Sequence, residues 1–131
     1  MMPYMRMKHD VDPVKQMFDE VGDLSGFEIF NNQVLLGVYI RPTKTASGLF
    51  ITDNTRDEDK WQGKVGIVLK KGPTAFIDKT GEWFDGVTVN DGDCLITRPS
   101  DGFLLTFRNV LCKLVVDTST KGRIQFPDEV W

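Results

Sequence analysis

The sequence is poor in the residues that usually build metal sites. It contains one histidine, His9, and two cysteines, Cys94 and Cys112. Structural zinc sites need four closely spaced Cys and His ligands, so the sequence predicts no metal site. Each cysteine lies in an apolar stretch, where a small buried thiol is the ordinary expectation, although the sequence leaves a disulfide between them open. We expect neither a metal nor a cofactor.

Long apolar runs and clustered positive charge are also missing. No stretch approaches the roughly 20 apolar residues that span a membrane, and the N-terminus lacks the apolar core of a secretory signal. Lysine and arginine are scattered, and the formal net charge is −3, which argues against nucleic acid as the main partner. These absences predict a cytoplasmic protein that binds neither membrane nor nucleic acid.

The sequence shows no common catalytic motif. It has no glycine-rich phosphate loop of either usual pattern, no GxSxG and no HExxH. The acidic run Asp57-Glu58-Asp59 suggests a metal site at first sight, but adjacent carboxylates in a polar segment are more often simply solvated. We therefore expect no catalytic residues and no enzymatic activity.

Residues 12–22 predict one short helix. Asp12 is a suitable N-cap, Pro13 suits the first turn, and Gly22 suits the end. Apolar residues fall at helical spacing and form one stripe: Val14, Met17, Phe18 and Val21. The stripe must pack against the domain or against a neighbouring chain.

Beyond this helix the apolar pattern changes to the alternation of β-strands. Two alternating segments, 33–41 and 64–70, predict the best strands. Further strands are expected at 86–89, 93–98, 103–108 and 110–116, separated by turn sequences such as Asn90-Asp91-Gly92. Many short strands with close turns predict an all-β fold, a small β-barrel with a short N-terminal helix.

A long polar segment, 43–62, separates the first two strands and carries the apolar triplet Leu49-Phe50-Ile51. Periodicity alone leaves two interpretations about equal: a short barrel strand with Phe50 inward, or an exposed docking segment. A connection of this length without its own secondary structure is usually functional, which favours docking.

The order of these features resembles GroES-type co-chaperonins (the chaperonin-10 family). In that family a mobile loop after the first strand carries Ser-Gly or Gly-Gly and then an aliphatic tripeptide, matched here by Ser47-Gly48 and Leu49-Phe50-Ile51. Gly63 matches the glycine that closes the loop. Residues 87–96 are similar to the family's Val-x-Val-Gly-Asp-x-Val strand pair, and 103–115 resemble its closing segment.

The resemblance implies a non-enzymatic co-chaperonin. It would form a ring, expected to be a heptamer, that caps an ATP-dependent GroEL-type chaperonin and encloses a client protein. The resemblance to the family's mobile loop assigns chaperonin binding to six residues: Ser47, Gly48, Leu49, Phe50, Ile51 and Thr52. Disorder of this loop before binding would agree with its polar composition, which cannot build a core by itself.

The resemblance also assigns a roof hairpin and a subunit interface. The roof residues are Phe76, Ile77, Asp78, Lys79, Thr80, Gly81, Glu82 and Trp83, within 72–86. Ordinary hairpin packing or a subunit contact is the alternative, and we favour it slightly for Trp83 and Phe84. The family joins a strand near the start of one subunit to the closing strand of the next, which nominates Val34, Val110, Leu111 and Leu114.

Several features depart from the family. About thirty residues precede the first strand, the roof segment is longer and more aromatic, and fifteen residues follow the last strand. We therefore divide the chain into an N-terminal extension (1–26), a barrel domain (27–116) and a C-terminal extension (117–131). Such departures are typical of a divergent member. A virus-encoded protein acting in the host cytoplasm on a capsid protein is one candidate.

A different class of function remains open. A monomeric OB- or SH3-like barrel with the same strands would use the long loop to grip an oligonucleotide or a peptide. Phe50, Trp61 and Trp83 would then serve as stacking platforms. The weak basicity of the chain counts against this alternative.

Overall fold

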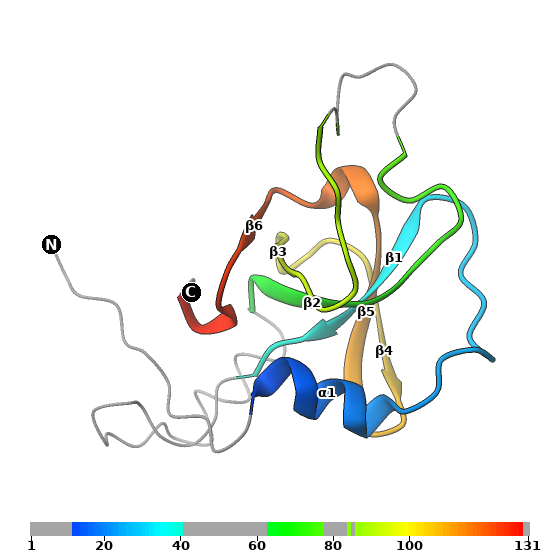
Figure 1. Cartoon of the computed structure of the whole chain (residues 1–131), viewed down its shortest axis with the longest axis vertical. Coiled ribbons are helices and arrows are strands. Elements are labelled where there is room, and N and C mark those ends of the chain that lie inside the picture. Colours follow the sequence, from blue (N-terminus) through cyan, green and yellow to red (C-terminus); the bar gives the residue numbers. More distant parts are fainter. Residues whose placement is uncertain (1–11, 41–62, 78–83, 85, 130–131) are drawn as a thin grey trace, which may run out of the picture.

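The computed structural model describes residues 12–40, 63–77, 84 and 86–129. They form one six-stranded antiparallel sheet and one short helix, α1 (Pro13–Val21), as Figure 1 shows. The strands are β1 (Gln33–Val38), β2 (Val65–Lys71), β3 (Cys94–Ile96), β4 (Phe103–Phe107), β5 (Val110–Val116) and β6 (Gly122–Ile124). Two 3₁₀ turns, η1 (Asp117–Ser119) and η2 (Pro127–Glu129), flank β6. The mostly β fold with one short helix agrees with the expectation from sequence.

The helix begins and ends as its sequence predicts. The carboxylate of Asp12 accepts a hydrogen bond of 2.9 Å from the Val14 N–H, and Pro13 opens the first turn. Gly22 ends the helix with a φ of 64°, a left-handed conformation that glycine adopts without strain. Gly37 lets the helix approach the sheet, because a Cβ there would lie 2.0 Å from the sulfur of Met17.

The sheet order is β4-β5-β1-β2-β3-β6, so β1 lies in the middle and pairs with both β2 and β5. Both faces are buried. The face toward α1, which we call the helix face, carries Leu35, Tyr39, Ile67, Leu69, Cys94 and Cys112. The opposite side, which we call the second face, carries Val34, Leu36, Val68, Leu95 and Val115. Alternate residues of β1 therefore belong to two apolar clusters, one on each face of the sheet.

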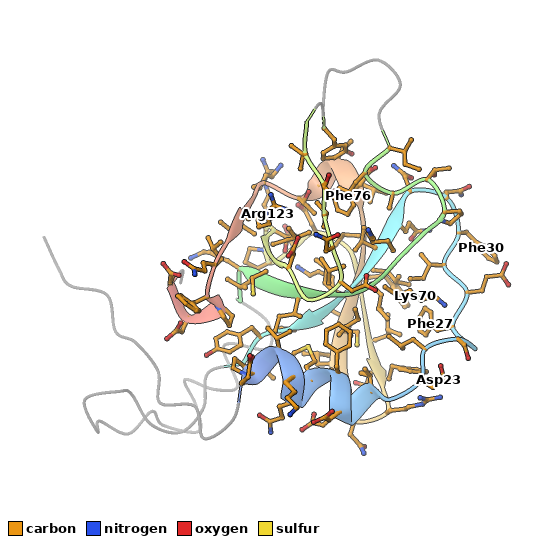
Figure 2. All side chains as sticks on the ribbon, viewed as in Figure 1. Asp23, Phe27, Phe30, Lys70, Phe76 and Arg123 are labelled. Atoms are coloured by element: carbon orange, nitrogen blue, oxygen red, sulfur yellow. The ribbon has the colours of Figure 1, made fainter. Side chains whose placement is uncertain are left out.

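Two cations fix the chain between α1 and β1. Arg108 donates hydrogen bonds of 2.7 Å to the carbonyls of Val21 and Asp23, and Lys70 donates one of 2.8 Å to the carbonyl of Leu24. Arg108 lies in the tight β4–β5 turn, where its φ of 48° precedes a residue with a φ of 70°. Figure 2 shows Lys70 directed toward the segment that contains Asp23 and Phe27. These bonds hold the end of the helix against the sheet.

After β2 the chain lacks one predicted strand and adds another that was not predicted. The predicted strand at 86–89 is wrong, because the structure has no strand there. The carbonyls of Thr88 and Val89 accept instead from the side chains of Arg123 and Lys71. The C-terminal tail, for which packing on the domain or on a neighbour was open, adds β6 to the sheet beside β3.

The sheet has two edges, β4 and β6. In the described ranges no strand pairing joins them, and the predicted closure into a barrel stays a prediction. Among those same residues, no helix is long and apolar enough to cross a membrane.

Candidate functional site

The six predicted chaperonin-binding residues, Ser47 to Thr52, lie outside the described residues, but both ends of their segment are placed. The Tyr39 N–H donates a 3.1 Å hydrogen bond to the carbonyl of Val65, and Val38 lies opposite Gly66. Two residues lie between the end of β1 and the segment 41–62, and two lie between this segment and the start of β2, so that both ends lie at neighbouring positions of the sheet. A rigid antiparallel pair holds both ends of the segment.

The predicted roof is described only at its base. Asp78, Lys79, Thr80, Gly81, Glu82 and Trp83 lie outside the described residues, whereas Phe76, Ile77 and Phe84 are placed. Phe76 has a φ of 60°, which is uncommon for a bulky side chain. Its ring meets that of Phe84 edge to face, with centroids 5.2 Å apart. The two ends of the roof segment are therefore joined by an aromatic contact.

A buried carboxylate holds this base in place. Asp117, 3% exposed, accepts hydrogen bonds from the Phe76 N–H at 2.9 Å and from the Asn32 amide at 2.8 Å. Its own N–H donates to the Asn32 carbonyl at 2.9 Å. One side chain thereby connects the start of β1, the end of β5 and the roof base. The sequence analysis missed this role, and a polar residue directly after a long apolar strand is the only signal for it.

An open hollow of about 380 Å³ lies beside the roof base. Phe76, Phe84 and Val87 line one side of it, and Gly122 and Arg123 of β6 line the other. Figure 2 places Phe76 and Arg123 on neighbouring parts of the molecule. Ile77, 61% exposed, extends the apolar surface. This region can contact an apolar partner but brings together no set of catalytic groups.

The predicted subunit-interface residues lie in the interior of the sheet. Val34 and Val110 are buried, and Leu111 and Leu114 are partly buried. β1 pairs with β2 and β5, while β5 pairs with β4 and β1, so both edges of each strand are occupied within the chain. The assignment of these four residues to a subunit interface stays a prediction, which must take account of these pairings within the chain. Strand edges for such a contact remain at β4 and β6.

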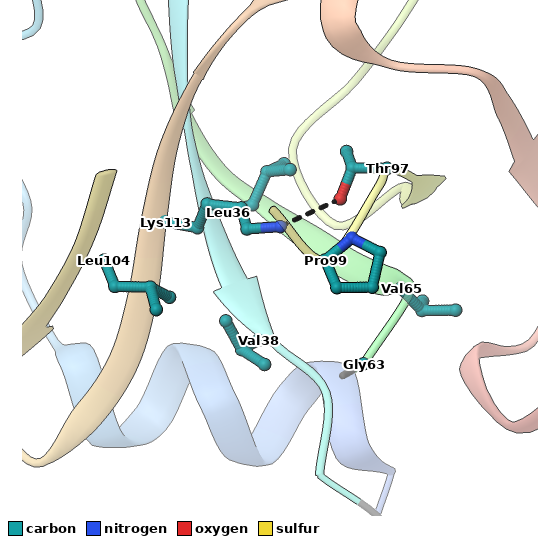
Figure 3. Close-up of a pocket in the computed structure, with 9 residues that line it drawn as sticks. Leu36, Val38, Gly63, Val65, Thr97, Pro99, Leu104 and Lys113 are labelled. Carbon is teal, nitrogen blue, oxygen red and sulfur yellow. Dashed lines mark hydrogen bonds between the residues drawn. The ribbon is translucent and has the colours of Figure 1, made fainter. Parts of the chain in front are cut away.

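The second face contains a buried lysine. The ammonium of Lys113 donates to the carbonyl of Arg98 at 2.9 Å and to the hydroxyl of Thr97 at 3.3 Å. Figure 3 shows it reaching across β1 toward Thr97, beside a cavity of about 10 Å³, enough for about one water molecule. Burial lowers the pKa of Lys113, and the carboxylate of Asp101 opposes that shift.

The two cysteines occupy the helix face as free thiols. Burial raises the pKa of each thiol from 9.0 to about 11, which keeps both protonated at neutral pH. Their place in the apolar cluster agrees with the expectation of small buried side chains. The disulfide that the sequence left open is absent from this fold.

In the described parts of the chain, no cluster of His, Cys, Asp or Glu side chains is arranged to hold a metal ion. No family model matches the sequence, and no curated protein matches it either. The sheet positions three features for contact with a partner: the long connection after β1, the roof base, and the two sheet edges.

Proposed function

We propose that this protein is a GroES-like co-chaperonin, a non-enzymatic subunit of a ring that caps an ATP-dependent chaperonin of the GroEL type. The triplet Leu49-Phe50-Ile51 docks into an apolar groove of the chaperonin, and the ring encloses a client protein. For a virus-encoded member, a capsid protein is the client we favour. The ATP chemistry belongs to the partner.

The observation that carries this proposal is the position of the long connection. The segment 41–62 starts and ends on paired residues of β1 and β2, held by the Tyr39–Val65 hydrogen bond. An insertion of this length between two antiparallel neighbours leaves the sheet undisturbed, since its ends already meet. Such a segment is suited to carry three apolar side chains away from the core to a partner.

Energetics favour a multivalent partner. Burying the triplet is worth about 1.5–3 kcal/mol per side chain, or roughly 5–9 kcal/mol in all. Ordering about ten backbone residues costs about 1–2 kcal/mol each, which exceeds this gain, so one segment alone binds weakly or not at all. A ring presents several segments at once, and avidity raises the affinity by about 10²–10⁴. Weak single contacts also let changes in the partner's groove release the whole cap.

The roof base is consistent with the same function. Asp117 fixes Phe76, and Phe76 contacts Phe84, so both ends of the predicted roof segment stand on the second face of the sheet. In the proposed ring, the roofs of neighbouring subunits together cover the chamber. The exposed Ile77 would then be available to a client or to the adjacent roof.

The test is retention of a GroEL-type chaperonin by the tagged protein in the presence of ATP, with wild type compared to Phe50→Asp. We expect the substitution to abolish retention, because a carboxylate cannot enter an apolar groove without a partner charge. The control is Phe30→Asp, which alters a phenylalanine that is 64% exposed and outside the segment. Equal retention of wild type and Phe50→Asp would remove the triplet from the mechanism.

Size-exclusion chromatography with light scattering separates this proposal from its rival. A ring elutes at a multiple of the 14.9 kDa chain mass at micromolar concentration. A protein that remains monomeric contradicts the ring and leaves the OB- or SH3-like binding barrel as the better interpretation. In that case oligonucleotides and peptides become the ligands to test.

A further inference from the structure

The outer edge of β4 lacks the features that normally protect an exposed strand. Its sequence, Phe-Leu-Leu-Thr-Phe, has no charge and no proline, and it pairs with β5 in unbroken register over its whole length. Phe103 is 69% exposed and Thr106 is also exposed. Natural proteins usually protect such edges with lysine, proline, a bulge or a covering segment. In the described ranges no strand pairs with this edge, and the one covering contact is the Phe27 ring, which packs edge to face on Phe107 at the C-terminal end of β4.

The opposite edge of the sheet, β6, is short and offers a matching surface. Its one charged side chain, Arg123, is held within the chain by the carboxylate of Asp93 at 3.1 Å and by the carbonyl of Thr88. Phe126, 42% exposed, lies two residues after the end of the strand. β6 therefore combines a backbone edge with an exposed aromatic ring at its C-terminal end.

Strand direction makes these two edges complementary. All neighbouring strands of the six-stranded sheet are antiparallel, so β4 and β6 run in opposite directions. If a second copy continues the sheet, its β6 meets β4 in the antiparallel sense. The Phe103 end of β4 then faces the Phe126 end of β6, which brings two exposed aromatic rings together.

We propose that subunits assemble head to tail, with the outer edge of β4 in one copy pairing with the outer edge of β6 in the next. Such a contact uses two different surfaces, so its repetition produces a closed ring or an open filament. Closure into a ring rests on the proposed function. The inference adds which two strands form the interface of that ring. It also gives the C-terminal strand a role, since β6 is the edge that the tail adds to the sheet.

The experiment places one lysine on each edge. Phe103→Lys alters β4 and Gly122→Lys alters β6, where an added Cβ would meet only the Ile96 side chain at 3.8 Å. We expect each variant to fall from the assembled mass to the 14.9 kDa monomer in light scattering, with an unchanged circular dichroism spectrum. Thr106→Lys, at another exposed position of β4, replaces Phe103→Lys if that variant does not fold.

Mixing the two variants tests the head-to-tail arrangement directly. The β4 variant keeps an intact β6 and the β6 variant keeps an intact β4, so together they form heterodimers of twice the monomer mass and nothing larger. Phe30→Lys is the matched control, because it adds the same charge to a phenylalanine of similar exposure, 64% against 69%, that belongs to no strand. We expect this control to retain the wild-type mass.

Several outcomes overturn the inference. Wild-type protein that stays monomeric contradicts it, and so do edge variants that assemble like wild type. A Gly122→Lys variant that still dimerises, beside a monomeric Phe103→Lys variant, indicates β4–β4 pairing instead. The proposed function fails separately: an assembly that depends on both edges but does not retain a chaperonin keeps the interface and removes the co-chaperonin.

Discussion

The two faces of the central sheet differ in chemistry although they share the same strands. The helix face carries apolar side chains, two protonated thiols and the Tyr39 ring, and the amphipathic helix α1 covers it. The second face carries the buried ammonium of Lys113. The roof base covers this face through Phe76. One face is thus closed by a regular element, and the other by a segment that polar bonds must hold. The difference separates the part that stabilises the fold from the part that positions the proposed functional segments.

The largest expected effect comes from a matched pair of neighbours, Leu35 on the helix face and Leu36 on the second face. Both are fully buried, so replacing either with alanine should lower the free energy of unfolding by about 2–5 kcal/mol in urea titrations. Only Leu35→Ala should also speed amide exchange in α1, because the helix packs on the helix-face cluster. Similar exchange in both variants would show that the two faces are not independent.

Removal of the Asp117 carboxylate should weaken the second face specifically. Asp117→Ala leaves two part-buried donors, the Phe76 N–H and the Asn32 amide, without their acceptor, at about 1 kcal/mol for each. Amide exchange at Phe76 should accelerate and the urea midpoint should fall. Asp91→Ala, at an exposed aspartate in a turn, serves as the control and should change neither quantity.

The thiols of the helix face should make stability decrease in alkali. Their pKa is about 11 in the folded protein and 9.0 when exposed, so the unfolded chain loses these protons first as the pH rises. The contribution of the thiols to the free energy of unfolding is fully present below pH 9 and is lost between about pH 9 and 11. Each thiol lowers this free energy by up to about 1.4 kcal/mol for each pH unit. Urea titrations from pH 8 to 10.5 should show a smaller decrease for Cys94→Ala/Cys112→Ala than for wild type. Equal slopes would exclude the thiols as the cause.

The smallest effect is expected at Lys113, and its sign is opposite. Because burial lowers the pKa of Lys113, the unfolded chain binds this proton more tightly than the folded chain does. This residue therefore makes the protein more stable as the pH rises from the folded pKa toward 10.5. Lys113→Met should change stability at pH 7 by about 1 kcal/mol or less, since it removes a desolvated charge together with its hydrogen bonds. In the same alkaline urea titrations, Lys113→Met should lack this gain in stability with rising pH. A variant whose stability depends on pH as in wild type would contradict the lowered pKa of Lys113.

Local sequence alone predicts several elements with close agreement. The helix follows from Asp12, Pro13 and Gly22, because its capping bonds lie within the segment itself. Strand β5 appears at the predicted residues, 110–116, and β4 ends one residue earlier than predicted. Such segments combine a clear apolar period with turn residues, so that little depends on distant parts of the chain.

Tertiary structure decided what depends on distant partners. The alternation at 86–89 resembles a strand, yet the carbonyls of Thr88 and Val89 accept hydrogen bonds from the side chains of Arg123 and Lys71. The tail became β6 because β3 offered it an edge. The Asp117 carboxylate accepts hydrogen bonds from Asn32 and Phe76 because folding brings these residues to it from 85 and 41 positions away in the sequence. The sequence by itself determined the helix, most of the strands and their apolar sides, whereas strand order, sheet edges and buried polar bonds required the folded chain to bring remote groups together.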